Sequence, residues 1–291
     1  MLTRRTLIAA VAGACLPPLL SRKLHGKALA ADFAQIEFKV AGRLGVAVLD
    51  TDSGRSLAWR ADELFPMCST FKWLLAAQLL TRIDAGEEQG DRVVPYASRD
   101  LLEHSPVTSA NLEQGRMPVL DLAAAAVSQS DNTAANLLLD AVGGPASLTG
   151  YLRNLGDPVT RLDRMEPQLN AATPGDPRDT TTPFAMVENM NYLLLGDGLS
   201  EGSRVKLIDW LVGSVTGREK LRAGLSAAWP TGDKTGMGGY GSTNDVAIVW
   251  PTGRKPVLIA AYLTETTAGV PSRNNALADV GREVTFWVTE P

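Results

Sequence analysis

Histidine and cysteine are almost absent from this chain of 291 residues, which holds two of each. Cys15 and Cys68 can form at most one disulfide, which excludes a disulfide-stapled scaffold, and so few residues exclude nearly every Cys/His metal site. Aromatic residues are scarce at 6%, but 45% of the residues are hydrophobic, enough for one large core or two smaller ones. No apolar run reaches the roughly 18 to 20 residues that a membrane-spanning helix needs. The composition predicts a globular protein.

Residues 1–30 differ from the rest of the chain in charge and in hydrophobic pattern. Arg4-Arg5 precedes an apolar stretch from Leu7 to Leu20, and Ala28-Leu29-Ala30 matches a signal-peptidase site. This arrangement predicts a cleaved signal peptide over 1–30, of the twin-arginine or the general secretory type, and a periplasmic protein. Acylation of Cys15, as in a lipoprotein, is the less favoured alternative because the residues before it match a lipobox poorly.

Removal of this leader changes both the charge and the residue inventory of the protein. It removes five basic residues and no acidic one, so the formal net charge falls from −4 to −9. An acidic protein without a basic block lacks the electrostatic footprint of a nucleic-acid-binding protein. Only His104 and Cys68 remain of the four residues, and the apolar neighbours of Cys68 predict a buried thiol. We expect no metal and no cofactor, so acid–base chemistry falls to lysine, glutamate and serine.

Hydrophobic patterning changes twice along the mature chain. Alternation over Phe38–Leu49 and Ser56–Trp59 predicts a β-hairpin. Asn244–Trp250 and Val257–Leu263 predict strands near the other end of the chain. Between these regions, from Thr70 to about Leu195, the pattern is helical.

Helices dominate the centre of the sequence and close its end. The clearest segments are Thr70–Ile83, Pro118–Ser128, Thr133–Ala141 and, near the C-terminus, Asn275–Val288. Strands at both ends around a helical block predict an α+β fold, in which an antiparallel sheet formed by both chain ends is covered by helices. We expect an α/β sandwich domain over 31–62 and 213–291, an inserted all-α domain over 63–212, and a site in the cleft between them.

A serine and a lysine interrupt the apolar run at the start of the helical block. In Cys68-Ser69-Thr70-Phe71-Lys72 the serine and lysine are three residues apart, so they share a helix face. A buried ammonium either has a lowered pKa or meets a carboxylate. Ser69 lies at the helix N-terminus, where N–H groups favour developing negative charge. The pair therefore predicts an activated nucleophile, although a helix-capping serine beside a surface lysine, as in the second S-x-x-K at Ser203–Lys206, is the simpler alternative.

Other motifs add weight to the catalytic interpretation. They are Ser130-Asp131-Asn132 before a helix, Glu166-Pro167-Gln168-Leu169-Asn170 in a loop, and Lys234-Thr235-Gly236 before a strand. Taken singly, each would be a helix cap, a surface carboxylate or a turn. By chance S-x-x-K occurs about once per chain, but S-D-N and K-T-G each occur in roughly one chain in ten or fewer. Their joint occurrence in one order is much rarer.

Together these motifs resemble those of class A serine β-lactamases. The resemblance covers essentially the whole mature chain through the segments Gly42–Val46, Phe65–Lys72, Ser130–Asn136, Glu166–Asn170, Gly175–Pro183 and Lys234–Gly236. It implies hydrolysis of β-lactam antibiotics through a serine acyl-enzyme, deacylation by an activated water, and antibiotic resistance. We expect a monomer that acts on small-molecule β-lactams without a cofactor.

The resemblance implies four catalytic residues. Ser69 attacks the β-lactam carbonyl, and its proton passes to Lys72 directly or to Glu166 through a water; the sequence leaves both routes open. Ser130 passes a proton to the departing lactam nitrogen. Glu166, with Asn170, then binds and deprotonates the water that releases the acyl group.

The resemblance also implies a substrate-binding set. The backbone N–H groups of Ser69 and Met237 form an oxyanion hole, and Lys234 attracts the substrate's carboxylate. Asn132 holds the side-chain amide of the substrate, and His104 forms a wall of the cleft. The full implied set is Asn132, Asn170, Lys234, Thr235, Gly236, Met237 and His104.

Four further residues enter through the resemblance. An ion pair, here Arg164 with Asp179, pins the loop that carries Glu166. The family usually supplies a second cation to the substrate carboxylate, and Lys220 and Arg273 are both open candidates for it.

Rival functions fit the sequence less well. A penicillin-binding D,D-peptidase shares the S-x-x-K, S-x-N and K-T-G motifs but lacks a deacylating carboxylate, so Glu166 and Asn170 argue against it. A β-lactam sensor domain would ordinarily need membrane helices. A Ser-His-Asp esterase would depend on His104 alone, without a G-x-S-x-G turn.

Overall fold

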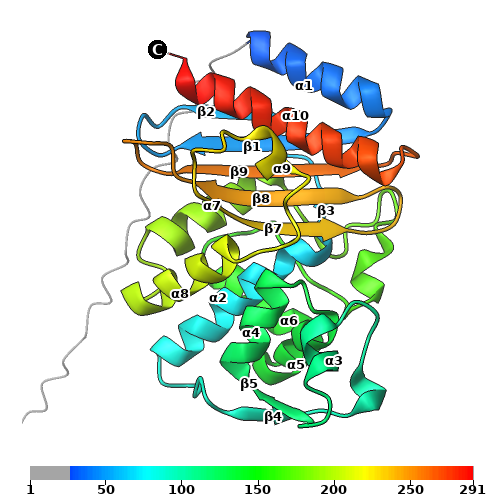
Figure 1. Cartoon of the computed structure of the whole chain (residues 1–291), viewed down its shortest axis with the longest axis vertical. Coiled ribbons are helices and arrows are strands. Elements are labelled where there is room, and N and C mark those ends of the chain that lie inside the picture. Colours follow the sequence, from blue (N-terminus) through cyan, green and yellow to red (C-terminus); the bar gives the residue numbers. More distant parts are fainter. Residues whose placement is uncertain (1–26, 291) are drawn as a thin grey trace, which may run out of the picture.

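A computed structural model describes residues 27–290 of the chain (Figure 1). Its strands are β1 (Arg43–Asp50), β2 (Ser56–Trp59), β3 (Phe65–Pro66), β4 (Val93–Pro95), β5 (Arg116–Pro118), β6 (Thr180–Thr181), β7 (Thr231–Met237), β8 (Thr243–Val249) and β9 (Val257–Thr264). Its α-helices are α1 (Lys27–Val40), α2 (Phe71–Asp84), α3 (Pro106–Ala110), α4 (Val119–Ser128), α5 (Asn132–Val142), α6 (Pro145–Asn154), α7 (Pro183–Met190), α8 (Glu201–Val212), α9 (Leu221–Gly224) and α10 (Val270–Thr289). Short 3₁₀ turns are η1 (Cys68–Thr70), η2 (Ser98–Asp100) and η3 (Gln168–Ala171), and η4 (Asn191–Leu195) is a π-helical turn.

Both ends of the chain build one antiparallel sheet. Its strand order is β2-β1-β9-β8-β7, so the first hairpin pairs directly with the last strand. The predicted α+β fold class is confirmed. β7 is an edge strand of this sheet, and it contacts η1 and α8 of the helical part of the molecule.

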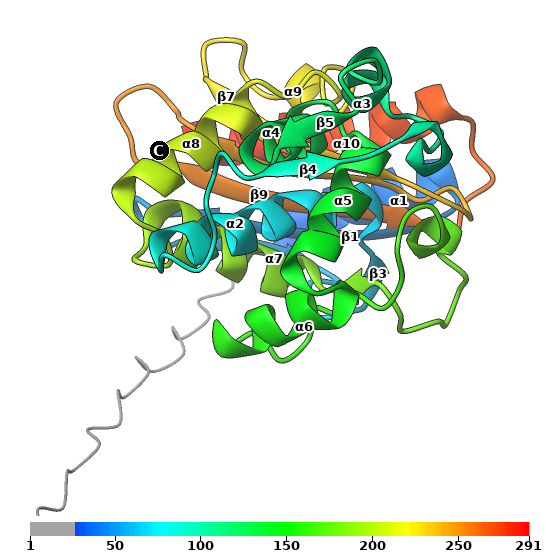
Figure 2. The same ribbon diagram turned by 90° about the horizontal axis from the view of Figure 1, so that it is seen from below.

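The sheet is buried on both faces, and alternate residues of each strand serve separate cores. On β8, Val246 and Ile248 pack in the core shared with the central helices, whereas Ala247 and Val249 pack in the core shared with α1 and α10. Figure 1 shows α1 and α10 on one side of the sheet and the central helices on the other. Figure 2, which looks from the helical side, shows α2 running beneath the sheet.

The first strand begins later than its sequence pattern predicts. Phe38 belongs to α1 rather than to a strand, so the prediction of strand from Phe38 is wrong over its first residues. Phe33, Ile36 and Val40 are buried with helical spacing, while Phe38 is 86% exposed. The apolar contacts of a helix therefore override the local alternation.

Helix prediction was more successful in the centre and at the end of the chain. The segments predicted at Thr70–Ile83, Pro118–Ser128, Thr133–Ala141 and Asn275–Val288 correspond to α2, α4, α5 and α10. The K-T-G motif is a contrasting case: its local sequence predicts a turn, but in the structure it lies within strand β7.

The predicted leader falls largely outside the described residues, since these begin at Lys27. Its predicted cleavage point after Ala30 lies within α1. None of the helices between residues 27 and 290 is long and apolar enough to cross a membrane.

Candidate active site

Ser69 lies in a tight turn between β3 and α2. It occupies η1, directly after Cys68, whose φ of +46° is the left-handed conformation that turns the chain. Cys68 is fully buried, as predicted, and burial raises the pKa of its thiol. Ser69 keeps 9% of its surface exposed. The turn thus presents the serine hydroxyl and hides the thiol beside it.

Gly236 lets strand β7 run directly against this turn. A Cβ at position 236 would lie 2.7 Å from Met67 O and 3.2 Å from Ser69 N, so no side chain fits there. Asn244 on β8 donates to Pro66 O and Met67 O at 2.8 and 3.0 Å and ties the turn to the sheet. The backbones of Ser69 and of the end of β7 are therefore neighbours, as an oxyanion hole requires.

Lys72 is a fully buried ammonium surrounded by acceptors. Its Nζ lies 3.0 Å from Glu166 Oε1 and donates to Ser130 O at 2.9 Å and to Asn132 Oδ1 at 2.5 Å. Burial lowers the pKa of Lys72, and the charge of Glu166 raises it. Both expectations from the sequence, a lowered pKa and a carboxylate partner, hold for this lysine.

The Ser69 hydroxyl donates to the same carboxylate, with 3.4 Å between its Oγ and Glu166 Oε1. The other oxygen, Glu166 Oε2, accepts from Asn170 Nδ2 at 2.5 Å. Glu166 is 2% exposed. One buried carboxylate therefore joins the serine, the lysine and the asparagine that the sequence predicted.

Ser130 and Lys234 form a second pair. Lys234 Nζ donates to Ser130 Oγ at 3.0 Å and to Thr235 O at 2.9 Å. Burial and the charge of Lys72 lower the pKa of Lys234 to about 7. Ser130 has a φ of +57° and is 6% exposed; its hydroxyl accepts from Lys234 and its carbonyl from Lys72.

Asp131 serves the structure rather than the chemistry. Its carboxylate caps α5 through Ala134 N at 2.8 Å and accepts from Val107 N and Thr108 N at 3.0 and 2.9 Å. Asn132, the next residue, binds Lys72 and donates to Glu103 O at 2.9 Å. The capping interpretation of S-D-N thus holds for Asp131.

Asn136 is a site residue that motif reasoning missed. Its side chain makes two bonds to the backbone of Glu166, accepting from N and donating to O at 2.9 Å each. It lies one helical turn after Asn132 on α5. That i, i+4 spacing was the one available signal in the sequence.

The loop that carries Glu166 is pinned by the predicted ion pair. Arg164 Nε lies 2.5 Å from Asp179 Oδ2, and Asp179 Oδ1 accepts from Asp163 N and Arg164 N at 2.7 and 2.9 Å. Asp179 is fully buried, and its own carbonyl accepts from Met67 N at 2.9 Å. The pair therefore links the loop to the turn before Ser69.

Asp179→Asn should loosen this loop. We expect the free energy of unfolding to fall by roughly 2–4 kcal/mol, because Arg164 loses a charged partner, and deacylation to slow as Glu166 shifts. Urea unfolding and single-turnover kinetics measure the two effects. Asp176→Asn is the matched control: Asp176 binds the exposed Arg178 at 2.8 Å and lies 3.8 Å from Arg164, so its unfolding midpoint should move little. Equal losses in both variants would contradict a special role for Asp179.

A hydroxyl pair and a lysine lie beyond Lys234. Thr235 Oγ1 is 2.6 Å from Thr216 Oγ1, and Lys220 Nζ donates to Thr216 O at 3.3 Å. Lys220 is 5% exposed. Thr216 had no sequence signal, because its role depends on a contact between distant segments.

The remaining predicted residues lie at the rim. Met237 is 43% exposed at the end of β7. His104 is exposed, with Nε2 3.2 Å from Gln129 O, and its carbonyl accepts from Asn132 N at 3.1 Å. Arg273 lies in the first turn of α10, where its buried Nε has no hydrogen-bond partner among the described residues.

Known proteins resemble this chain over nearly all of its length. The Beta-lactamase enzyme family model matches residues 28–288. Beta-lactamase L2 of Stenotrophomonas maltophilia is 45% identical, with 97% of this chain and 98% of the relative covered. Beta-lactamase CTX-M-8 of Citrobacter amalonaticus is 43% identical, with 94% of each covered.

Solved structures agree in fold. An ancestral (GNCA) class A β-lactamase superposes with a TM-score of 0.88 at 56% identity, covering 89% of this chain and 99% of that one. The chain belongs to the class A serine β-lactamases. It hydrolyses β-lactam antibiotics through a serine acyl-enzyme intermediate and confers resistance to them, which confirms the predicted family, activity and enzyme class.

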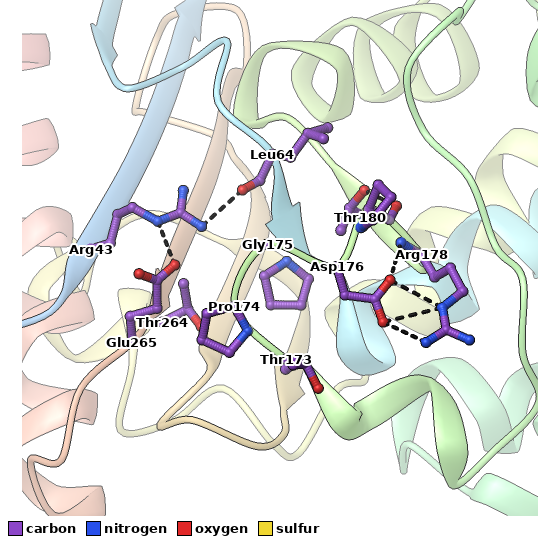
Figure 3. Close-up of a pocket in the computed structure, with 13 residues that line it drawn as sticks. Arg43, Leu64, Thr173, Pro174, Gly175, Asp176, Arg178, Thr180, Thr264 and Glu265 are labelled. Carbon is purple, nitrogen blue, oxygen red and sulfur yellow. Dashed lines mark hydrogen bonds and ion pairs between the residues drawn. The ribbon is translucent and has the colours of Figure 1, made fainter.

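The β-lactamase also holds a cavity, with a volume of about 110 Å³, whose lining does not include Ser69 (Figure 3). It lies under the Glu166 loop, between Pro174 and Arg43, and its lining contains none of the predicted site residues. Arg43 binds Glu265 and the carbonyl of Leu64 at 2.8 and 3.0 Å. Because this charge is already paired, the cavity adds no chemistry to the site.

In this β-lactamase, no group of three or more His, Cys, Asp or Glu side chains is arranged to hold a metal ion between residues 27 and 290. Cys68 is a free thiol. A Cβ at Gly238 would lie 2.6 Å from its Sγ, so glycine is needed where the β7–β8 connection passes Cys68.

Proposed function

We propose that Ser69 is the nucleophile of this β-lactamase and that Lys72 and Glu166 act together as its proton acceptor. The observation that carries this is one shared carboxylate oxygen: Glu166 Oε1 is 3.4 Å from Ser69 Oγ and 3.0 Å from Lys72 Nζ. Because this oxygen contacts both groups, a proton that leaves Ser69 can reach Glu166 directly and pass from there to Lys72. The N–H groups of Ser69 and Met237 stabilise the oxyanion that forms.

Ser130 then delivers a proton to the departing lactam nitrogen. Its hydroxyl accepts from Lys234, and the nearby ammonium favours loss of the Ser130 proton. Lys72 donates to the Ser130 carbonyl and so ties this residue to the acceptor pair. The proton that the acceptor pair takes from Ser69 replaces the one that Ser130 gives to the lactam nitrogen, so acylation neither consumes nor releases a proton.

Deacylation depends on a water held by Glu166 and Asn170. Their side chains are bonded at 2.5 Å, and Asn136 fixes the Glu166 backbone on both sides. The carboxylate takes a proton from this water as the water attacks the ester carbon, and the proton returns to Ser69 Oγ when the bond between Ser69 and the acyl group breaks. A penicillin-binding protein lacks this step, so the pair supports hydrolysis over mere acylation.

Lys234, Thr235 and Lys220 bind the substrate's carboxylate. Lys220 is preferred to Arg273 because Thr216 connects it to Thr235 through contacts of 3.3 and 2.6 Å. Asn132 contacts the amide of the acyl side chain, and His104 walls the site at its exposed rim. Gly236 contributes by its lack of a side chain.

Several further properties belong to the same proposal. The protein is exported by the leader in residues 1–30 and acts as a periplasmic monomer. Its all-α domain comprises 63–212 and its α/β domain 31–62 with 213–291. The sheet formed by both chain ends and the helices that lie between them in the sequence support this division.

Turnover of a chromogenic cephalosporin across pH tests this function. The purified protein should pass through many turnovers, whereas stoichiometric colour without turnover would match a penicillin-binding protein. Because the pKa of Lys234 is lowered to about 7, raising the pH through that value removes a charge that binds the substrate. We expect kcat/KM to fall above pH 7 while kcat holds to higher pH, since the bound carboxylate stabilises the ammonium.

Lys234→Arg is the control for this pH profile. Arginine stays charged across the range, so the alkaline fall in kcat/KM should disappear. A fall that persists unchanged in the variant would assign it to another group, such as Lys72.

A further inference from the structure

A buried carboxylate, Asp245, lies behind the hydroxyl of Thr235. The two residues are directly opposite each other in the β7–β8 pairing, so their side chains share one face of the sheet. Asp245 is fully buried, and Thr235 is 5% exposed. Asn244 and Lys234 point to the opposite face, toward Ser69 and Ser130. Asp245 is therefore outside the catalytic cluster but adjacent to the carboxylate-binding hydroxyl.

Asp245 anchors the segment that carries Lys220. Its Oδ2 accepts from Leu221 N at 3.1 Å, one residue beyond the lysine. Asp233, on the same face of β7, holds Arg222 of this segment at 2.5 Å. Two buried carboxylates thus hold residues 220–222 against the sheet.

Few other interactions hold the Lys220 side chain in place. It is 5% exposed, yet within residues 27–290 its Nζ donates a single hydrogen bond, of 3.3 Å to Thr216 O. A buried ammonium is costly unless an anion compensates it. Asp245 Oδ1 has no hydrogen-bond partner among the described residues, and its charge interacts with that of Lys220.

The charges of this cluster depend on each other. Burial and the charge of Asp233 raise the pKa of Asp245 well above its usual range, and the charges of Lys220 and Arg222 offset part of that rise. Lys220 is thus one of the groups that favour the ionised form of Asp245.

We propose that Asp245 is a positioning residue that holds Lys220 beside Thr216 and Thr235 and thereby sets the affinity for the carboxylate of β-lactam substrates. This inference rests on the proposed role of Lys220. Asp245 also repels the incoming carboxylate, but Lys220 has a flexible stem and one long hydrogen bond. Loss of its position therefore outweighs loss of the repulsion.

Asp245→Asn separates charge from structure. The amide keeps the size of the side chain and an oxygen that can accept from Leu221 N, but it removes the charge. We expect KM for benzylpenicillin to rise about tenfold, kcat to change less than twofold, and both constants for benzylpenicillin methyl ester to stay within twofold of wild type. The ester has no charge for Lys220 to bind, whereas a merely structural defect would affect both substrates.

A double-mutant cycle with Lys220→Met tests whether Asp245 acts through Lys220. The single variants should raise KM for benzylpenicillin by similar factors, and the double variant should add nothing further. Should Asp245→Asn fail to fold, Asp245→Glu is the alternative: it keeps the charge but displaces it by one methylene group, so KM for benzylpenicillin should rise while both constants for the methyl ester stay within twofold of wild type.

The outcomes separate the claims. An unchanged or lowered KM for benzylpenicillin in Asp245→Asn, or equal losses with the ester, overturns the role of Asp245. Additive effects in the cycle show that Asp245 does not act through Lys220 and also overturn it. Absence of benzylpenicillin turnover by the wild-type protein would instead refute the proposed function itself.

Discussion

Glu166→Ala is expected to form the acyl-enzyme and then stall. Acylation survives because Lys72 remains: burial lowers its pKa, and loss of Glu166 removes a charge that raises it, so the amine becomes neutral and basic. Deacylation has no such substitute, because Glu166 is the carboxylate bound to Asn170. We expect kcat to fall by roughly 10²–10⁴-fold, the typical worth of a general base.

Stopped-flow absorbance with a chromogenic cephalosporin measures this result. The variant should give a burst of one equivalent followed by a nearly flat phase, while the wild type gives a linear trace. Glu166→Gln is the matched control for size, and it should stall in the same way. Wild-type turnover in either variant would remove Glu166 from deacylation.

Ser69→Ala is expected to abolish both the burst and the turnover. No other hydroxyl occupies the turn between Cys68 and the start of α2 in contact with Glu166. Removal of a serine nucleophile costs a factor on the order of 10⁶ in kcat in a serine hydrolase of another fold. The same assay measures it, with the variant's unfolding curve confirming a native fold.

Ser203→Ala provides the matched control, since Ser203 begins the second S-x-x-K of the chain. Its hydroxyl donates to Asp84 Oδ1 at 2.7 Å near the start of α8, far from the catalytic groups in the sequence. We expect wild-type kinetics and a loss of stability of about 1 kcal/mol. Residual turnover in Ser69→Ala comparable to that of Ser203→Ala would contradict the choice of nucleophile.

The sequence was most informative where local chemistry and local structure agree. Helix α2 can be predicted because it begins with a long apolar run, and Lys72 is the one charged residue between Phe71 and Leu80. The structure shows why that charge is tolerated: Glu166, almost a hundred residues later, lies 3.0 Å away. Motifs named the partners, but only the fold shows that they share a carboxylate oxygen.

Strand β7 could not be predicted because its residues serve the site. Thr231–Met237 contains two glycines, an aspartate and a lysine, all poor strand formers. It is nevertheless paired with β8 along its whole length. Gly236 is required for close approach to Ser69 and Lys234 for the bond to Ser130, so function overrides local propensity here.

Contacts between distant segments account for the other omissions. Asn136 clamps Glu166 across 30 residues, and Thr216 meets Thr235 across 19. Asp245 binds the backbone beside Lys220 across 24 residues. Each is an ordinary polar residue in its own neighbourhood, and only the packing of the sheet against the loops gives it a role.

The central claim is that Ser69 carries the acyl group and Glu166 is needed to remove it. Mass spectrometry of Glu166→Ala after mixing with benzylpenicillin tests this most directly. We predict a persistent adduct with the full mass of the antibiotic, located by proteolysis on the peptide that contains Ser69, while the wild type returns to its free mass. An adduct on another peptide, or a variant that returns to its free mass as fast as the wild type, would contradict the account.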